Sequence, residues 1–166
     1  PFNAITMMPR SDGKPFEREA VVDDDICTSC GICVGSCPTS MPFRKKSGLV
    51  PGIDLPGYPA KDLRDDMHTA SMKMSGTDRV MVIGCEHGIS AKKFTSDSRS
   101  GIDLPCVAML PPSFIDYALS KDLADGVAII GCREGSCQYR LGPQWTEDRL
   151  ENRRDPHLRS RVPRER

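Results

Sequence analysis

Three short runs of apolar residues in the second half of the chain predict β-strands. The runs span Arg79 to Gly84, Ile102 to Ala108 and Gly126 to Gly131. Between the second and the third run, Pro112 to Ala124 has the apolar spacing of a helix with one buried face. Short apolar strands that alternate with helices are typical of sheets buried on both faces. The pattern therefore predicts an α/β domain with a small parallel sheet, doubly wound as in flavodoxin-like and Rossmann-like folds.

The first half of the chain has a weaker pattern. Ala20 to Val22 is expected to form a strand, and Met8 to Glu19, with its prolines, glycine and charges, a hairpin loop before it. Residues 47–59 are rich in glycine and proline, which break regular structure, so we expect a linker there. Residues 60–74 place apolar side chains at helical spacing and predict an amphipathic helix. These side chains are Leu63, Met67, Ala70 and Met74.

The predicted elements divide the chain into four parts. A small N-terminal part spans residues 1–46, and the linker spans residues 47–59. The α/β domain spans residues 60–145, and an arginine-rich segment follows over residues 146–166. Thr146, followed by two acidic residues, predicts the start of a helix in this segment. The segment has two interpretations, a solvated basic helix and tail or a surface that docks onto a partner.

The composition narrows the class of protein. The 166 residues include 23 basic and 23 acidic side chains, so nothing suggests a nucleic-acid partner. No apolar run approaches the ~20 residues that cross a bilayer. No signal peptide is visible, and the eight cysteines have the close spacings of metal ligands, so we expect a cytoplasmic protein. Attachment to the cytoplasmic face of a membrane, through partners or an upstream segment, is left open.

The first group of cysteines forms the most specific motif of the chain. Cys27-Thr-Ser-Cys30-Gly-Ile-Cys33-Val-Gly-Ser-Cys37-Pro38 resembles the C-x2-C-x2-C-x3-C-P motif of bacterial ferredoxins. In that motif the first three cysteines bind one 4Fe-4S cluster, while the fourth turns away to a different cluster. Residues 1–46 are therefore expected to be an α+β, ferredoxin-like domain. Zinc is the alternative metal, because C-x2-C pairs also bind zinc.

The start of the chain bears on the remaining ligand of this cluster. Pro1-Phe2-Asn3-Ala4-Ile5 is similar to the segment that follows the last cysteine of two-cluster ferredoxins. We therefore expect the sequence to be a fragment whose preceding residue is a cysteine that joins Cys27, Cys30 and Cys33. Cys37 would then belong to a cluster whose other ligands lie upstream. One or two 4Fe-4S clusters are accordingly expected.

The second group of cysteines follows the predicted strands. It comprises Cys85, Cys106, Cys132 and Cys137. Because ligands collect at the carboxyl ends of parallel strands, we expect the four thiols to meet at one edge of the sheet and to form a metal site. The alternatives are a zinc site, a redox-active dithiol and a set of structural thiols. Cys106 is the first candidate for a purely structural role, because a cysteine that follows a buried strand can act as a small apolar residue.

Residues 79–145 resemble the delta subunit of methyl-viologen-reducing hydrogenase, which is also found fused to heterodisulfide-reductase-type proteins. The most specific element is Gly131-Cys132-Arg-Glu-Gly135-Ser-Cys137-Gln-Tyr139, followed by Gly142. The position of Cys106, ahead of a Pro-x-Phe helix, also matches. The resemblance implies a 2Fe-2S cluster in this domain, bound by Cys85, Cys106, Cys132 and Cys137.

The chain departs from this family at its first strand. The family often has a C-x2-C pair there, whereas this chain has Cys85 alone, followed closely by His87. Histidine replaces cysteine as a ligand in Rieske centres, so His87 is an alternative ligand. Because four cysteines already suffice for a 2Fe-2S cluster, we expect His87 not to bind iron.

Two functions from different classes follow. The sequence has no phosphate-binding loop, dinucleotide motif or Ser/His/Asp constellation, so no catalytic residue is predicted. The first hypothesis is an electron-transfer component of an oxidoreductase, which relays electrons between 4Fe-4S and 2Fe-2S clusters. Its expected partners are other redox subunits, namely a hydrogenase, a heterodisulfide-reductase-like flavoprotein or a membrane cytochrome. The second hypothesis is an adaptor that zinc or a disulfide stabilises and that transfers no electrons.

Overall fold

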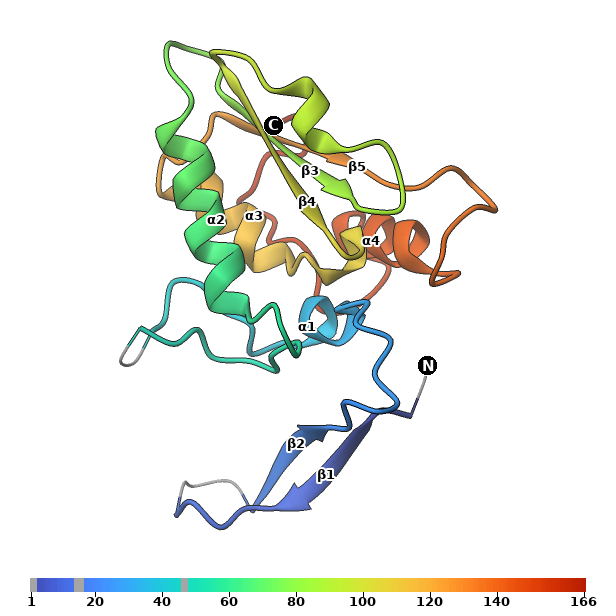
Figure 1. The fold of residues 1–166 in the computed structure, drawn as a ribbon. Helices are drawn as coiled ribbons and strands as arrows, with labels where there is room; N and C mark the ends of the chain where they lie inside the picture. Colours follow the sequence, from blue (N-terminus) through green and yellow to red (C-terminus); the bar gives the residue numbers. More distant parts are fainter. Residues whose placement is uncertain (1–2, 14–16, 46–47) are drawn as a thin grey trace.

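The computed structural model describes residues 3–13, 17–45 and 48–166. It begins with a two-stranded antiparallel hairpin of β1 (Ile5–Pro9) and β2 (Arg18–Val22). The hairpin projects from the rest of the molecule (Figure 1), and the strand β1 is exposed throughout. Met8 pairs with Glu19, so both strands run further toward the turn than the sequence predicts. A short helix, α1 (Ile32–Ser36), follows within the first cysteine motif.

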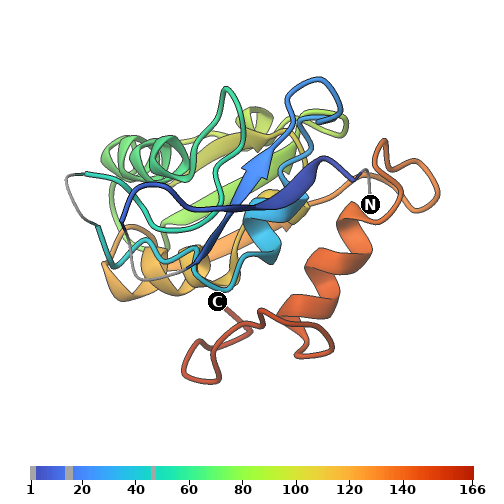
Figure 2. The same cartoon turned by 90° about the horizontal axis from the view of Figure 1, so that it is seen from below.

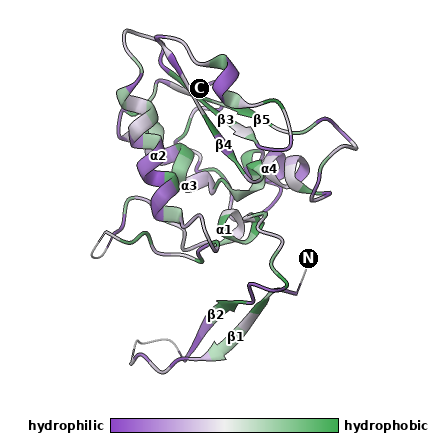
Figure 3. Cartoon of the chain, viewed as in Figure 1, coloured by the Kyte–Doolittle hydropathy of each residue, from purple (hydrophilic) through white to green (hydrophobic). Residues whose placement is uncertain are grey.

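A three-stranded parallel sheet forms the centre of the second half. β3 (Val80–Cys85) lies between β4 (Arg99–Leu104) and β5 (Gly126–Ile130). Hydrophobic segments run along these strands (Figure 3). β4 differs from the predicted strand of residues 102–108 because Pro105, which lacks a backbone donor, ends the ladder. The residues that follow form a short 3-10 helix, η2 (Val107–Met109).

Helices cover the sheet and complete the core. α2 (Ala60–Met72) contacts β4, and α3 (Pro112–Ser120) contacts β5. Both pack on the face of the sheet that carries Met81 and Ile83, in one hydrophobic core. On the opposite face, the 3-10 helix η1 (Ala91–Phe94) lies against β3 and β4, where Gly84 and Gly101 leave room for it. That the sheet belongs to the doubly wound class stays a prediction. No helix among the described residues is long and apolar enough to cross a membrane.

The expected linker also contributes to the core. Val50 and Leu55 are buried among the side chains of α2 and the sheet. Glycine and proline prevent regular structure in this stretch, but they do not prevent its apolar side chains from packing. The chain between α1 and α2 is therefore packed onto the domain.

The C-terminal segment packs on the same domain. α4 (Gly142–Leu150) begins four residues before the predicted start at Thr146, because Pro143 already favours the first turn of a helix. Beyond α4, the side chains of Leu158 and Val162 are buried in the main core. The segment after α4 is thus held by this chain itself, which neither of the two interpretations from the sequence anticipated.

An ion pair fastens this segment to α3. The Asp116 carboxylate is 1% exposed and accepts hydrogen bonds from Arg161, whose Nη2 lies 2.6 Å away. Arg159 Nη1 lies 3.4 Å from the same carboxylate. Arg161→Met removes the closer cation and leaves a buried charge less well compensated. We expect the free energy of unfolding, measured by urea denaturation, to fall by more than in the control variant.

Arg44→Met is the matched control for this experiment. Arg44 is exposed, so its loss is expected to change stability by less than about 0.5 kcal/mol. Equal stability of the two variants would show that the Asp116 pair does not anchor the segment.

Candidate metal centres

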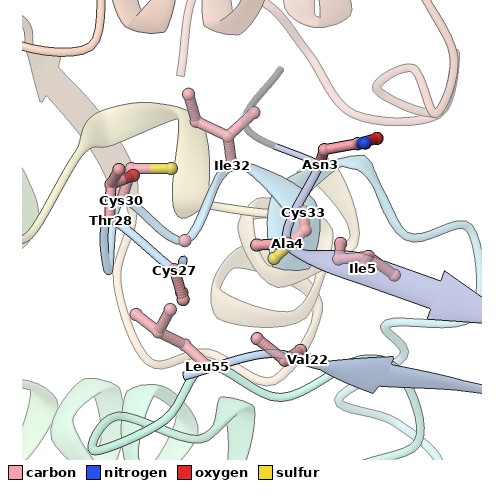
Figure 4. A pocket seen from close by; sticks show the side chains of 11 residues that line it. Asn3, Ala4, Ile5, Val22, Cys27, Thr28, Cys30, Ile32, Cys33 and Leu55 are labelled. Carbon is pink, nitrogen blue, oxygen red and sulfur yellow. The ribbon is translucent and has the colours of Figure 1, made fainter. Parts of the chain in front are cut away.

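Three cysteines of the first group lie around a single cavity. Cys27, Cys30 and Cys33 line a cavity of about 370 Å³ (Figure 4). Gly31, at a φ of 69°, takes the left-handed conformation that turns the chain from the loop of Cys30 into α1. Cys33 lies on α1 itself. The tight turn thus brings three thiols from one short loop and helix to one space.

The remaining walls of this cavity come from other parts of the chain. Ala4, Ile5 and Val22 contribute from the hairpin, and Leu55 from the stretch before α2. The start of the sequence therefore reaches the three cysteines, which is the position expected for the segment after a further ligand. The prediction of a preceding cysteine rests in part on Pro1 and Phe2, and these two residues lie outside the described residues.

Cys37 lies apart from this cavity. It lines a smaller cavity of about 120 Å³ together with Ser40, Pro111 and His157. Burial raises the pKa of Cys37, but hydrogen bonds from Thr39, Ile53 and Ser40 together lower it below its usual value. The Thr39 hydroxyl oxygen lies 3.1 Å from the Cys37 sulfur. The fourth cysteine of the motif thus lines a different cavity from the other three, and its role as a ligand of another cluster stays a prediction.

The charges of the first site fit a positively charged occupant. Burial raises the pKa of Cys33, and the neighbouring Cys30 raises it further. Three thiolates in one cavity repel one another, so all three can lose their protons only beside a cation. The backbone N–H of Ser29 donates to the Cys27 sulfur over 3.4 Å, as backbone amides do at iron-sulfur sites. Iron in a 4Fe-4S cluster would supply the positive charge that these thiolates need.

The second cysteine group converges beyond the carboxyl ends of the strands. The sulfur atoms of Cys85 and Cys132 are 3.5 Å apart. The sulfurs of Cys106 and Cys137 both adjoin Gly142, where a β-carbon would lie 2.5 Å from the first and 3.2 Å from the second. Cys106 also lies close enough to Cys85 to perturb its pKa. The structure therefore brings together all four cysteines of this group.

The protons of this group are shared unequally. A hydrogen bond from Cys106 lowers the pKa of Cys85 to about 5, and the same contact raises the pKa of Cys106. Burial, with Cys85 nearby, raises the pKa of Cys132 to about 11. One thiolate is thus stabilised by neighbours that keep their protons. A 2Fe-2S cluster would supply the positive charge that lets all four ionise.

None of the eight cysteines forms a disulfide. No three or more His, Cys, Asp or Glu side chains in the described part of the chain surround one point as the ligands of a single metal ion do.

The side chain of His87 is directed to Tyr139. Its Nε2 lies 3.3 Å from the Tyr139 hydroxyl oxygen, and the two rings meet edge to face with centroids 5.4 Å apart. The backbone of His87, in contrast, donates a hydrogen bond that helps to lower the pKa of Cys85. That His87 is not an iron ligand stays a prediction.

The two cysteine groups meet in a contact that sequence reasoning missed. Cys30 and Ile32 pack against Cys106 and Ala108 in one small buried cluster. Cys30 is 8% exposed and Cys106 is 1% exposed. Tyr139 and Trp145 pack around the cluster. α1 lies against η2, and Figure 2 shows α1 beside α4. No periodic signal could have predicted a contact between residues so far apart in the chain.

Comparison with known protein families identifies two matching regions in the chain. The family model for the 4Fe-4S binding domain matches residues 20–42, which contain the whole first cysteine motif. The model for the methyl-viologen-reducing hydrogenase delta subunit matches residues 88–166. The chain joins a 4Fe-4S binding domain to a hydrogenase delta-subunit domain. No curated protein and no solved structure gives a significant match.

The delta-subunit match defines which parts of the second site are typical of that domain. It includes Cys106, Cys132 and Cys137, and it begins three residues after Cys85. It also extends to Arg166, so the segment that folds back over α3 belongs to the matched region. The two matched regions therefore meet in the small buried cluster that holds Cys30 and Cys106.

Proposed function

We propose that this chain relays electrons between a 4Fe-4S cluster and a 2Fe-2S cluster within a larger oxidoreductase. In this proposal Cys27, Cys30 and Cys33 are ligands of the first cluster. The second cluster is held by Cys85, Cys106, Cys132 and Cys137. Each cluster, when bound, accepts and releases single electrons.

The observation that carries the proposal is the buried contact between the two cysteine groups. Cys30 belongs to the first set of ligands and Cys106 to the second, and both pack in one cluster of side chains with Ile32 and Ala108. An electron that leaves one site would reach the other through this packed contact. The surrounding apolar side chains exclude water, which is one of the factors that set reduction potentials.

The nature of the partners follows from the lack of substrate machinery in the sequence. An electron relay needs one partner that gives electrons and another that takes them. The delta-subunit match favours a hydrogenase complex. A heterodisulfide-reductase-like flavoprotein and a membrane cytochrome are the other partners that we propose.

Cys37 is proposed to be a ligand of a further 4Fe-4S cluster.

The proposal is tested by the metal content and colour of the full natural chain, purified without oxygen. We expect iron and acid-labile sulfide in amounts that fit both kinds of cluster, and visible absorption that bleaches with dithionite. Zinc without sulfide would refute the relay and support the adaptor hypothesis, because zinc thiolates do not absorb visible light.

A substitution at Gly142 tests the second site separately. A β-carbon there would lie 2.5 Å from the Cys106 sulfur. A free thiol can rotate away, whereas a sulfur bound to iron cannot. We expect Gly142→Ala to lower the 2Fe-2S content roughly by half or more and to leave the metal-free protein nearly as stable, because the steric conflict arises only on ligation.

Gln144→Ala is the control for Gly142→Ala, since Gln144 is exposed on the same helix. Its iron and sulfide content should equal that of the unmodified chain. Full 2Fe-2S content in Gly142→Ala would show that Cys106 is not fixed by a cluster.

A further inference from the structure

Arg149 is a buried cation at the junction between the two cysteine sites. It lies on α4 and is 1% exposed. Its Nη1 donates to the carbonyl oxygen of Ala108 over 2.9 Å, and its Nη2 donates to the hydroxyl oxygen of Ser36. Ala108 lies two residues after Cys106, and Ser36 ends α1, the helix that carries Cys33. One guanidinium therefore bonds to both cysteine-bearing segments.

The charge of Arg149 has no carboxylate partner among the residues that the structure describes. No ion pair found there includes Arg149, and its buried Nε has no hydrogen-bond partner. An uncompensated buried charge costs several kcal/mol, so a buried cation is expected to face an anion. Burial lowers the pKa of Arg149 to about 10, which leaves the side chain charged at neutral pH.

The anion that fits this position is thiolate-bound iron and sulfide. Because Arg149 Nη1 bonds to the carbonyl oxygen of Ala108, two residues after Cys106, its charge lies close to the second cysteine group. An iron-sulfur cluster with four thiolates carries a net negative charge, which grows by one when the cluster is reduced. A fixed positive charge nearby stabilises the reduced form more than the oxidised form.

We propose that Arg149 is a positioning residue that fixes the spacing between the two cysteine sites and that its charge favours reduction of the cluster held by the delta-subunit domain. The effect of the charge on reduction rests on the proposed function, because it requires a bound cluster. The spacing part concerns the protein chain alone and can be tested without metal.

The test of the charge uses Arg149→Gln and Arg149→Lys in the full natural chain. Each cluster is titrated under anaerobic conditions and followed by electron paramagnetic resonance. We expect Arg149→Gln to lower the equilibrium constant for reduction of the delta-subunit cluster at least tenfold, equal to about 59 mV for one electron. Arg149→Lys keeps the charge and should shift this constant less than about threefold.

Arg153→Gln is the matched control for the charge. Arg153 lies just beyond α4, is half exposed and pairs with Glu147 and Asp148. Its loss should leave both potentials unchanged, because an exposed charge is screened by solvent. If the equilibrium constant for reduction in Arg149→Gln stays within threefold of that in the unmodified chain, the proposed role of the charge is overturned.

The test of spacing uses the metal-free protein and the rate at which Cys30 is alkylated. Cys30 is buried in the cluster that it forms with Ile32, Cys106 and Ala108. We expect Arg149→Gln to speed alkylation of Cys30 at least tenfold relative to Cys132, while Arg153→Gln leaves it unchanged. An unchanged rate in both Arg149 variants would overturn the spacing role, even if the chain never held iron. Lack of iron in the unmodified chain would instead refute the proposed function.

Discussion

Cys106→Ala is expected to remove the proposed 2Fe-2S cluster and to leave the 4Fe-4S cluster in place. The reason is that Cys106 lies between Cys85 and Cys137 in the group of four sulfurs, so its loss takes away one quarter of the proposed ligands. Iron and sulfide should fall by the content of one 2Fe-2S cluster, and the absorption of the remaining 4Fe-4S cluster should persist. The measurement is iron and sulfide analysis with a visible spectrum.

Cys33→Ala is the reciprocal variant and serves as the control. It should lose the 4Fe-4S cluster and keep the 2Fe-2S cluster, because Cys33 lines the other cavity. If Cys106 is only a small apolar residue, Cys106→Ala will keep all its iron and lose about 1 kcal/mol or less of stability. That outcome would refute the four-cysteine site.

Gly35→Ala will separate α1 from the delta-subunit domain. A β-carbon at Gly35 would overlap the carbonyl oxygen of Ala108 and lie 2.8 Å from Arg149 Nη1. The carbonyl belongs to the backbone of η2, which cannot move aside as a flexible side chain can. We expect a loss of about 3 kcal/mol in the free energy of unfolding, at the upper end for overpacked sites.

Gly57→Ala is the control for Gly35→Ala. Gly57 has open space around it but a φ of 78°, so alanine there should cost only about 1 kcal/mol of backbone strain. Urea denaturation of both variants, with alkylation of Cys30, measures the difference. Equal losses in the two variants, with Cys30 still protected, would show that the close approach of α1 to η2 is not tight.

Local patterns explain which elements the sequence could predict. The apolar spacing of Leu63 and Met67 predicted α2, and the apolar runs before Cys85 and Cys132 predicted β3 and β5. β4 was predicted too late in the chain, because the apolar residues after Pro105 continue the run although the strand has ended. The cysteine motif also predicts that Cys37 serves a different cluster from its neighbours, and this stays a prediction.

Long-range packing explains what the sequence could not predict. The arginine-rich end of the chain has the composition of a solvated segment, yet Arg161 pairs with the buried Asp116 and Leu158 enters the core. Likewise, nothing local distinguishes Arg149 from the other arginines of the segment. Its role depends on Ser36 and Ala108, which come from distant parts of the chain.

The central claim is that two clusters lie side by side and exchange electrons. The most direct measurement is electron paramagnetic resonance of the fully reduced natural chain, compared with the sum of the spectra of Cys33→Ala and Cys106→Ala. We predict signals from both clusters that are split or broadened relative to this sum, because two paramagnets in close contact interact. A spectrum that equals the sum, or the absence of any cluster signal, would contradict the account.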